Sequence, residues 1–125
     1  VQANGNAMAV WNQYGGVLYG SHYIAGADWQ PTVLVDQGSQ NYGADIATTA
    51  DGGFITTWSQ FSANQYNVWF NRFTPSVGWD VPSWESSIVN NTPDYAGSAR
   101  IVVAPSGLAS VVWLQWNHIY AAYSL

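Results

Sequence analysis

Apolar residues occur along the chain in short runs, and each run is bounded by glycine, asparagine, aspartate or serine. The runs are rich in valine, isoleucine, threonine, tyrosine and tryptophan, which favour β-strands. No apolar run reaches the ~18 residues of a membrane span. The pattern therefore predicts an all-β protein made of short strands, with no helix longer than a turn or two and no membrane span.

One block of residues recurs three times without a gap. Its members are a glycine, a tryptophan six positions later and a glutamine two positions after the tryptophan, namely Gly5, Trp11 and Gln13, then Gly52, Trp58 and Gln60, then Gly107, Trp113 and Gln115. Asparagine, aspartate or serine precedes each glycine, and such pairs are signals for tight hairpin turns. The chain is therefore built from internal repeats.

A second block follows the first in each copy and aligns Tyr19, Trp69 and Tyr120. In the first two copies this block starts at Leu18 and Val68, and a further tryptophan, Trp29 or Trp79, comes eleven residues after that start. The extra residues of the longer repeat fall in connections, which a stacked repeat tolerates because each unit contacts only its neighbours.

Each repeat predicts four antiparallel strands. Strand one lies before the turn, at Ala44–Thr49 and Ala99–Ala104, and the first copy keeps only Val1-Gln2 of it. Strand two carries the repeat tryptophan, strand three carries the aromatic residue of the second block, and strand four lies near Thr32–Val35 and Ser86–Val89.

The repeat tryptophans lie 47 and 55 positions apart. Four antiparallel strands in a unit of this length are typical of a β-propeller blade. The predicted fold is an all-β propeller of nearly three four-stranded blades, at about 1–40, 41–94 and 95–125, the last of them incomplete.

Three blades are too few for a closed propeller, which needs roughly four to eight. We expect an open arc to expose the seam aromatics of its first and last blades. Either the chain, which has no initiator methionine and no signal peptide, is an excerpt of a longer propeller, or identical chains close the ring. Two copies give about six blades, so a dimer is the preferred assembly.

The segment Gly5-Asn6-Ala7-Met8-Ala9-Val10-Trp11 resembles the tandem G-N-A-x-A-V-W blade repeats of bacterial secreted β-propeller proteins. The chain is more loosely similar to propeller lectins built from near-identical blades. The resemblance covers almost the whole chain, and its motif implies a fold rather than an activity.

The repeat tryptophans are expected to fill the wedges between neighbouring blades, because they stand mid-strand beside small or β-branched residues. The repeat glutamines are expected to satisfy a free backbone group, with contact to a sugar hydroxyl as the alternative. Asp45 and Arg100 share one register in strand one, thirteen positions before their tryptophans, and predict an ion pair near the propeller axis.

The other recurring aromatic residues are candidate binding platforms. An exposed ring suits the C–H face of a pyranose, although it suits a seam between blades equally well. Polar residues beside these rings, among them Asn71, Arg72, Asp28 and Asp80, would bond to ligand hydroxyls. The candidate ligand-binding residues are Tyr19, Trp29, Trp69, Arg72, Trp79 and Tyr120.

The amino-acid composition restricts the classes of ligand and partner that the chain is expected to bind. Only 7% of residues are charged and the net charge is −5, which leaves no basic patch for nucleic acid. There is no cysteine, and His22 and His118 are neither repeat-equivalent nor at metal-ligand spacing, so no metal site or cofactor is predicted. The absence of lysine and the abundance of asparagine, serine, threonine and aromatic residues suggest a secreted or cell-surface bacterial protein.

We expect a non-enzymatic module that recognises glycans or small ligands on repeated aromatic sites. The alternative is a structural or protein-interaction scaffold, in which all the aromatics serve packing. An enzyme such as a glycosidase would need two opposed carboxylates, and the chain has no recognisable nucleophile motif.

Overall fold

The structure is a computed structural model, and it describes residues 1–38, 40–62, 64–85 and 95–124. These residues form twelve strands and no helix, which confirms the predicted all-β class. None of them belongs to a helix long and apolar enough to cross a membrane. The strands make three separate antiparallel sheets, called here the first, second and third sheet in chain order.

The first sheet has four strands. They are β1 (Ala7–Gln13), β2 (Val17–Ile24), β3 (Asp28–Trp29) and β4 (Val33–Asp36). β1 pairs along its whole length with β2, and β2 also pairs with β3 and β4. The strand predicted at Thr32–Val35 corresponds to β4, one residue further along the chain.

The second sheet has five strands. They are β5 (Asn41–Thr48), β6 (Phe54–Ser62), β7 (Gln65–Thr74), β8 (Gly78–Trp79) and β9 (Ser83–Glu85). The strands run in the order β5-β6-β7-β8, and β9 also pairs with β7. The fourth strand predicted at Ser86–Val89 lies outside the described residues.

The third sheet consists of β10 (Ala96–Val103), β11 (Ala109–Gln115) and β12 (His118–Ser124), paired in chain order. The register of β10 shifts between Gly97 and Arg100, and that of β5 shifts between Tyr42 and Asp45. These bulges occupy the same position in the repeat. They let both strands begin three residues before the predicted starts.

The predicted hairpin turns form at Gly5, Gly52 and Gly107. Each glycine has a positive φ, between +83° and +91°, which residues with a side chain rarely adopt. Each also donates its N–H to the carbonyl three residues earlier, over 2.8 to 3.1 Å. The short N-terminal segment of the first repeat therefore makes the same turn as the complete copies.

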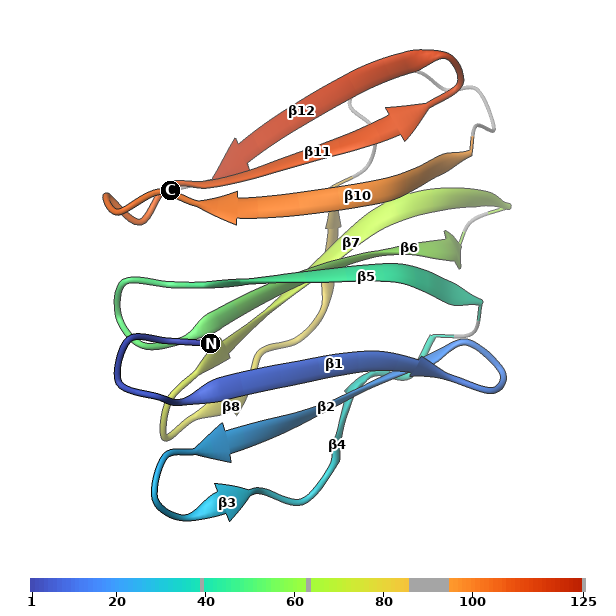
Figure 1. Ribbon diagram of the computed structural model, residues 1–125. Helices are drawn as coiled ribbons and strands as arrows, with labels where there is room; N and C mark the ends of the chain where they lie inside the picture. Colours follow the sequence, from blue (N-terminus) through green and yellow to red (C-terminus); the bar gives the residue numbers. More distant parts are fainter. Residues whose placement is uncertain (39, 63, 86–94, 125) are drawn as a thin grey trace.

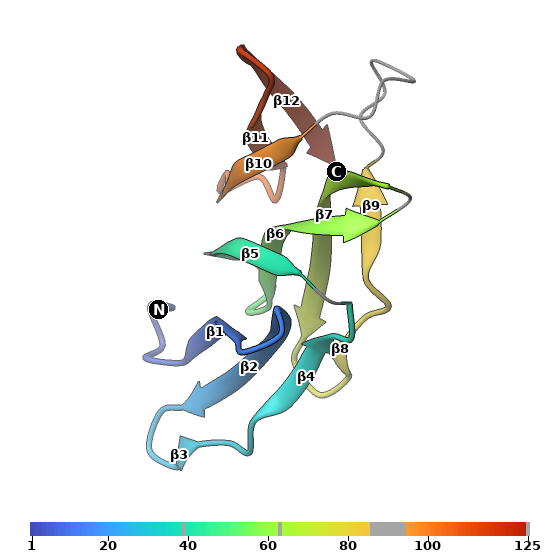
Figure 2. The same cartoon turned by 90° about the vertical axis from the view of Figure 1, so that its right-hand side faces the viewer.

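The sheets are stacked in chain order, with β5 between β1 and β10 (Figure 1). In the perpendicular view the second sheet extends from β5 on one side to β9 on the other (Figure 2). Strand one of the second and third repeats thus lies on one side of the stack. The three sheets do not close into a ring.

Two seams hold the sheets together. The first seam, between the first and second sheets, has Leu18, Val35 and Trp58 at its centre. The second seam, between the second and third sheets, contains two clusters, one around Trp113 and one around Ile101. In each seam, the sheet that comes later in the chain presents its repeat tryptophan to the earlier sheet.

The predicted burial of the repeat tryptophans is confirmed for two of them and wrong for the third. Trp58 is 0% exposed and Trp113 is 7% exposed, whereas Trp11 is 36% exposed. Trp11 lies on the face of the first sheet that no other sheet covers. Exposure was expected for the seam aromatics of both the first and the last blade; it is found at Trp11 of the first sheet, whereas Trp113 of the last sheet is buried.

The predicted ion pair between Asp45 and Arg100 does not form. The Asp45 carboxylate accepts a hydrogen bond from the backbone N–H of Ile101, over 3.0 Å, and the Arg100 guanidinium donates to the carbonyl of Ala99, over 2.8 Å. β10 is an edge strand, so N–H groups on its free side need partners from outside its sheet. The carboxylate satisfies one of them in place of the cation.

Candidate functional site

Tyr19, Trp69 and Tyr120 lie directly across the sheet from the repeat tryptophans. The register places Tyr19 opposite Trp11, Trp69 opposite Trp58 and Tyr120 opposite Trp113. The first and third pairs are stacked, with centroids 6.4 and 6.0 Å apart and interplanar angles of 23° and 21°. All three residues are partly buried. Two aromatic rings of each sheet therefore form one continuous surface.

Trp29 and Trp79 occupy equivalent short strands but have different surroundings. Trp79 packs against the core of the first seam and lies edge-on to Phe73, at 5.5 Å. Trp29 contacts Tyr23 at 5.4 Å and is 50% exposed. The second sheet thus uses three tryptophans, Trp58, Trp69 and Trp79, to cover the first sheet.

The repeat glutamines bind the indole groups. Trp58 Nε1 donates to Gln60 Oε1 over 3.1 Å, and Trp113 Nε1 donates to Gln115 Oε1 over 3.3 Å. The structural role favoured from the sequence is confirmed for both glutamines, with the indole as partner rather than the backbone. In the first sheet Gln13 is exposed, and no such bond joins it to Trp11 among the described residues.

Arg72 is held away from the aromatic position beside which it was predicted to act. Its guanidinium forms an ion pair with Asp51, over 2.6 Å, at the turn between β5 and β6. A hydrogen bond from the Thr49 hydroxyl and one from Arg72 lower the pKa of Asp51 to about 2. Asn71 is buried and donates to the carbonyl of Val35 over 3.1 Å, which ties the second sheet to the first.

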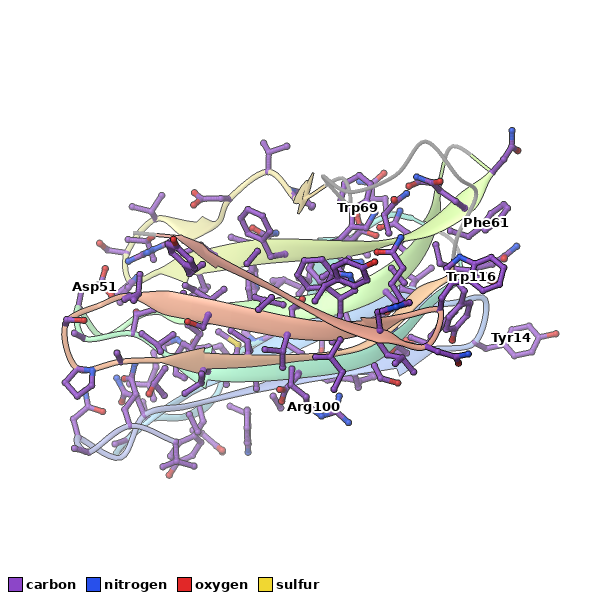
Figure 3. The ribbon with its side chains drawn as sticks, turned by 90° about the horizontal axis from the view of Figure 1, so that it is seen from above. Tyr14, Asp51, Phe61, Trp69, Arg100 and Trp116 are labelled. Carbon is purple, nitrogen blue, oxygen red and sulfur yellow. The ribbon has the colours of Figure 1, made fainter. Side chains whose placement is uncertain are left out.

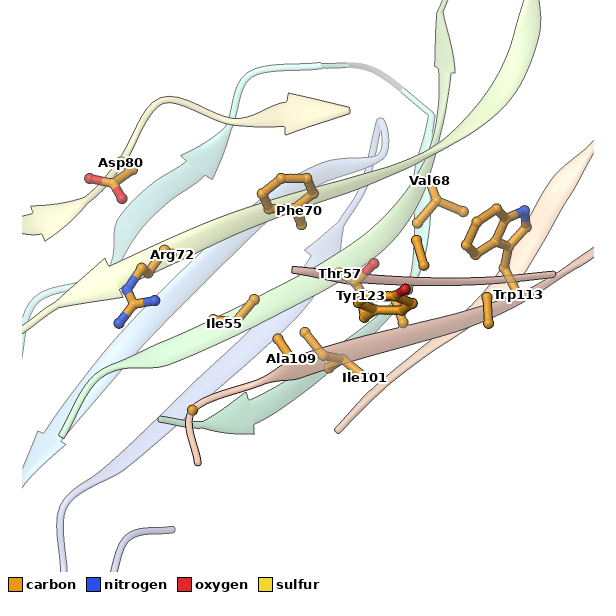
Figure 4. A pocket seen from close by; sticks show the side chains of 14 residues that line it. Ile55, Thr57, Val68, Phe70, Arg72, Asp80, Ile101, Ala109, Trp113 and Tyr123 are labelled. Atoms are coloured by element: carbon orange, nitrogen blue, oxygen red, sulfur yellow. The ribbon is translucent and has the colours of Figure 1, made fainter. Parts of the chain in front are cut away.

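A cavity of about 460 Å³ lies between the second and third sheets (Figure 4). Ile55, Val68 and Phe70 contribute apolar walls, and Arg72 and Asp80 contribute charged groups. In the first seam, Trp79 packs beside Gly20, the repeat equivalent of Phe70. No described residue of the third sheet takes the place of Trp79, so the cavity corresponds to the outer part of a seam.

The two histidines lie apart. His22 packs against Phe54 and Phe73 in the first seam, at centroid distances of 5.9 and 5.0 Å, and burial lowers its pKa. His118 lies beside Tyr120. Among the described residues, no three histidine, aspartate or glutamate side chains gather in a way that could hold a metal ion.

The structure reveals a second aromatic set that the sequence reasoning missed. Tyr14, Phe61 and Trp116 each follow the repeat tryptophan by three positions. Tyr14 and Trp116 lie in the turn between strands two and three, and Phe61 lies near the end of β6, just before that turn. All three are exposed, and they lie at the same end of the stack, opposite to Asp51 (Figure 3). We call them the turn-edge aromatics. Extending the repeat alignment by one residue beyond the glutamine would have found them.

A tyrosine cluster lies behind Phe61. Tyr42, Tyr66 and Tyr95 contact one another at centroid distances of 5.0 to 6.1 Å, and Phe61 lies edge-on to Tyr66 at 5.1 Å. Burial, together with hydrogen bonds to Tyr95 and Tyr66, raises the pKa of Tyr42 well above its usual value. Tyr42 therefore stays uncharged, and the cluster places tyrosine hydroxyl groups next to an exposed ring.

The structure thus brings Trp69 and Trp79 into the first seam and leaves Tyr19 and Trp29 on an uncovered face. Tyr120 packs against the core of the second seam, and Arg72 is paired at a distant turn. Ligand binding by these six residues stays a prediction. Searches with family models, curated proteins and solved structures found no match to this chain.

Proposed function

We propose that the three sheets are blades of a β-propeller and that the chain binds neutral glycans through the turn-edge aromatics. The proposal rests on one observation: an exposed aromatic ring recurs at the same repeat position, at the same end of every sheet. The seam tryptophans have an evident packing role, whereas Tyr14 and Trp116 project from turns. An exposed aromatic ring that recurs in or directly beside these turns is better explained by a ligand than by the core.

The chemistry of the three turns favours a sugar. A flat ring offers dispersion contacts to the C–H face of a pyranose, and neighbouring polar groups can bond to its hydroxyls. Amide side chains accompany each ring in sequence, namely Asn12 and Gln13, then Asn64 and Gln65, and Gln115 and Asn117. These turns contain no aspartate, glutamate, lysine or arginine, so we expect a neutral ligand rather than an acidic one.

Repetition of the ring gives three equivalent sites. A single aromatic platform binds a sugar weakly, but several sites on one rigid body raise the apparent affinity for a repeating polysaccharide. The proposed function is binding without catalysis, since the turns carry no carboxylate that could serve as a general acid. The charge-poor, lysine-free composition supports a secreted or cell-surface location.

A glycan array with the purified chain tests the proposal. We expect binding to neutral oligosaccharides and no preference for their sialylated or sulfated forms. Trp116→Ala should weaken binding by about threefold to tenfold, because an aromatic contact is worth about 0.5–1.5 kcal/mol beyond its buried area. Val77→Ala changes an exposed apolar residue in a different turn and serves as the matched control.

Two results would contradict the proposal. One is an array without any bound glycan, and the other is a glycan whose binding Trp116→Ala leaves unchanged. Either result would favour the second candidate function, a structural or protein-interaction scaffold. The observation behind that candidate is the packing role of Trp69, Trp79 and Tyr120, which were predicted as platforms but contact the seam cores.

A further inference from the structure

The uncovered face of the first sheet carries an aromatic residue at each of three seam positions. Trp11, Tyr19 and Trp29 occupy the repeat positions of Trp58, Trp69 and Trp79, the tryptophans with which the second sheet covers the first. We call these three exposed or half-exposed residues the open aromatic face. It has the same residue pattern and strand register as the covered set, but no sheet lies against it.

The first seam shows what such a face packs against. Trp58 lies on Leu18, with Val10 packed beside it, and both residues come from the face of the first sheet that points toward the second. The position of Val10 corresponds in the third repeat to Val112, and that of Leu18 corresponds to Ile119. The surface that complements the open aromatic face is therefore an aliphatic patch at these two positions.

The third sheet displays that patch to solvent. Val112, Leu114 and Ile119 are all exposed, whereas Val111 and Trp113, on the other side of β11, face the second sheet. Leu114 and Ile119 are directly opposite each other in the pairing of β11 with β12. We call these three residues the outer aliphatic face.

The outer aliphatic face has one charged neighbour among the described residues. Arg100 is paired with Val112 in the register, but it lies on β10, at the edge of the sheet. A cation at the edge of an apolar interface can keep its contact with water. It therefore does not prevent packing of the centre of the face.

We propose that a second copy of this chain covers the open aromatic face with its outer aliphatic face. The two halves of the interface lie on the same chain, at opposite ends of the stack, so one copy does not join them by itself (Figure 1). The joint repeats the geometry of the first seam between two molecules. Two copies related by a two-fold axis make two such joints and a ring of six sheets, within the roughly four to eight blades of closed propellers.

The mass of the purified chain in solution, measured by light scattering and sedimentation over a wide range of concentrations, tests this inference. We expect a species of twice the 13.6 kDa of one chain. Trp11→Arg and Leu114→Arg should each weaken the dimer by roughly tenfold or more, since each places a charge at the centre of the joint. Tyr14→Arg changes a more exposed aromatic residue outside the joint and should leave the mass unchanged.

Mixing the two charged variants separates a head-to-tail joint from a face-to-face one. In the mixture, one of the two joints pairs an unaltered aromatic face with an unaltered aliphatic face, so heterodimers should form where neither variant dimerises alone. A folded wild-type chain that stays monomeric would overturn the inference. So would a dimer that Trp11→Arg leaves intact, or open polymers larger than two copies.

Discussion

The first and second sheets place the same aromatic positions in opposite environments. Trp58 is 0% exposed, and its equivalent Trp11 is 36% exposed, although both stand mid-strand opposite an aromatic partner in the same register. The strands themselves therefore do not account for the difference. In this fold, the burial of a side chain depends on whether a neighbouring sheet covers it. Contacts between nearest neighbours likewise dominate the stability of repeat proteins.

The largest effect that separates the two sheets should come from truncating the tryptophans. Trp58→Ala removes a fully buried ring and leaves a cavity, at a cost of about 3–5 kcal/mol in the free energy of unfolding. Trp11→Ala should cost far less in the monomer, because solvent already reaches the ring. Urea denaturation at low protein concentration measures both values. Equal losses would contradict the distinction between a covered and an open face.

A smaller effect is expected at the glutamines. Gln60→Met keeps the volume of the side chain but leaves the buried indole N–H of Trp58 without its acceptor, which should cost about 1–3 kcal/mol. Gln13→Met should be close to neutral, since Gln13 is exposed and makes no such bond. The same denaturation experiment gives the comparison. A neutral Gln60→Met would show that the indole bond contributes little.

The smallest effect concerns the hairpin turns. Asp51 occupies the position of Asn4 in the first repeat, and its pKa is lowered to about 2 from 3.8. A lowered pKa in the folded state stabilises the fold above pH 3.8, and this contribution is lost as the pH falls through about 2. Because the side chains of Arg72 and Asp51 are about half exposed, this contribution should be about 0.5 kcal/mol or less.

Asp51→Asn gives the hairpin turn of the second repeat the side chain that Asn4 provides in the first repeat. The variant should lose the part of the acid destabilisation that wild type shows between about pH 4 and pH 2. Thermal unfolding of both proteins across this interval measures it. Identical pH profiles would mean that the Arg72 ion pair and the Thr49 hydrogen bond do not stabilise the turn.

Local patterns in the sequence were sufficient to predict much of the fold. Turn residues such as Gly52 and the spacing around Trp58 identified the strands and their order, because hairpin chemistry and strand periodicity are short-range properties. The early starts of β5 and β10 were missed, since both follow from β-bulges that no residue signal marked. The burial of Trp58 was predicted correctly from its repeat position, but the same reasoning failed at Trp11, which no neighbouring sheet covers.

The site was harder to predict because it depends on contacts between residues that are far apart in the sequence. The equal register of Asp45 and Arg100 suggested that they meet, but the Asp45 carboxylate instead accepts a hydrogen bond from the backbone N–H of Ile101 on the edge strand β10. Neighbouring sequence suggested that Arg72 serves Trp69, but the pairing with Asp51 comes from the adjacent turn. Trp116 was overlooked because the aligned block ended at the glutamine.

The most direct test of the account follows the two equivalent tryptophans during association. Incorporation of 5-fluorotryptophan allows ¹⁹F resonances to be recorded, with Trp11→Phe and Trp58→Phe to assign the two signals. The account predicts that Trp58 shows no solvent isotope shift at any concentration. Trp11 should show such a shift in the dilute chain and lose it as the mass doubles, so that the two positions become alike. A Trp11 signal that keeps its solvent isotope shift at every concentration would contradict the account.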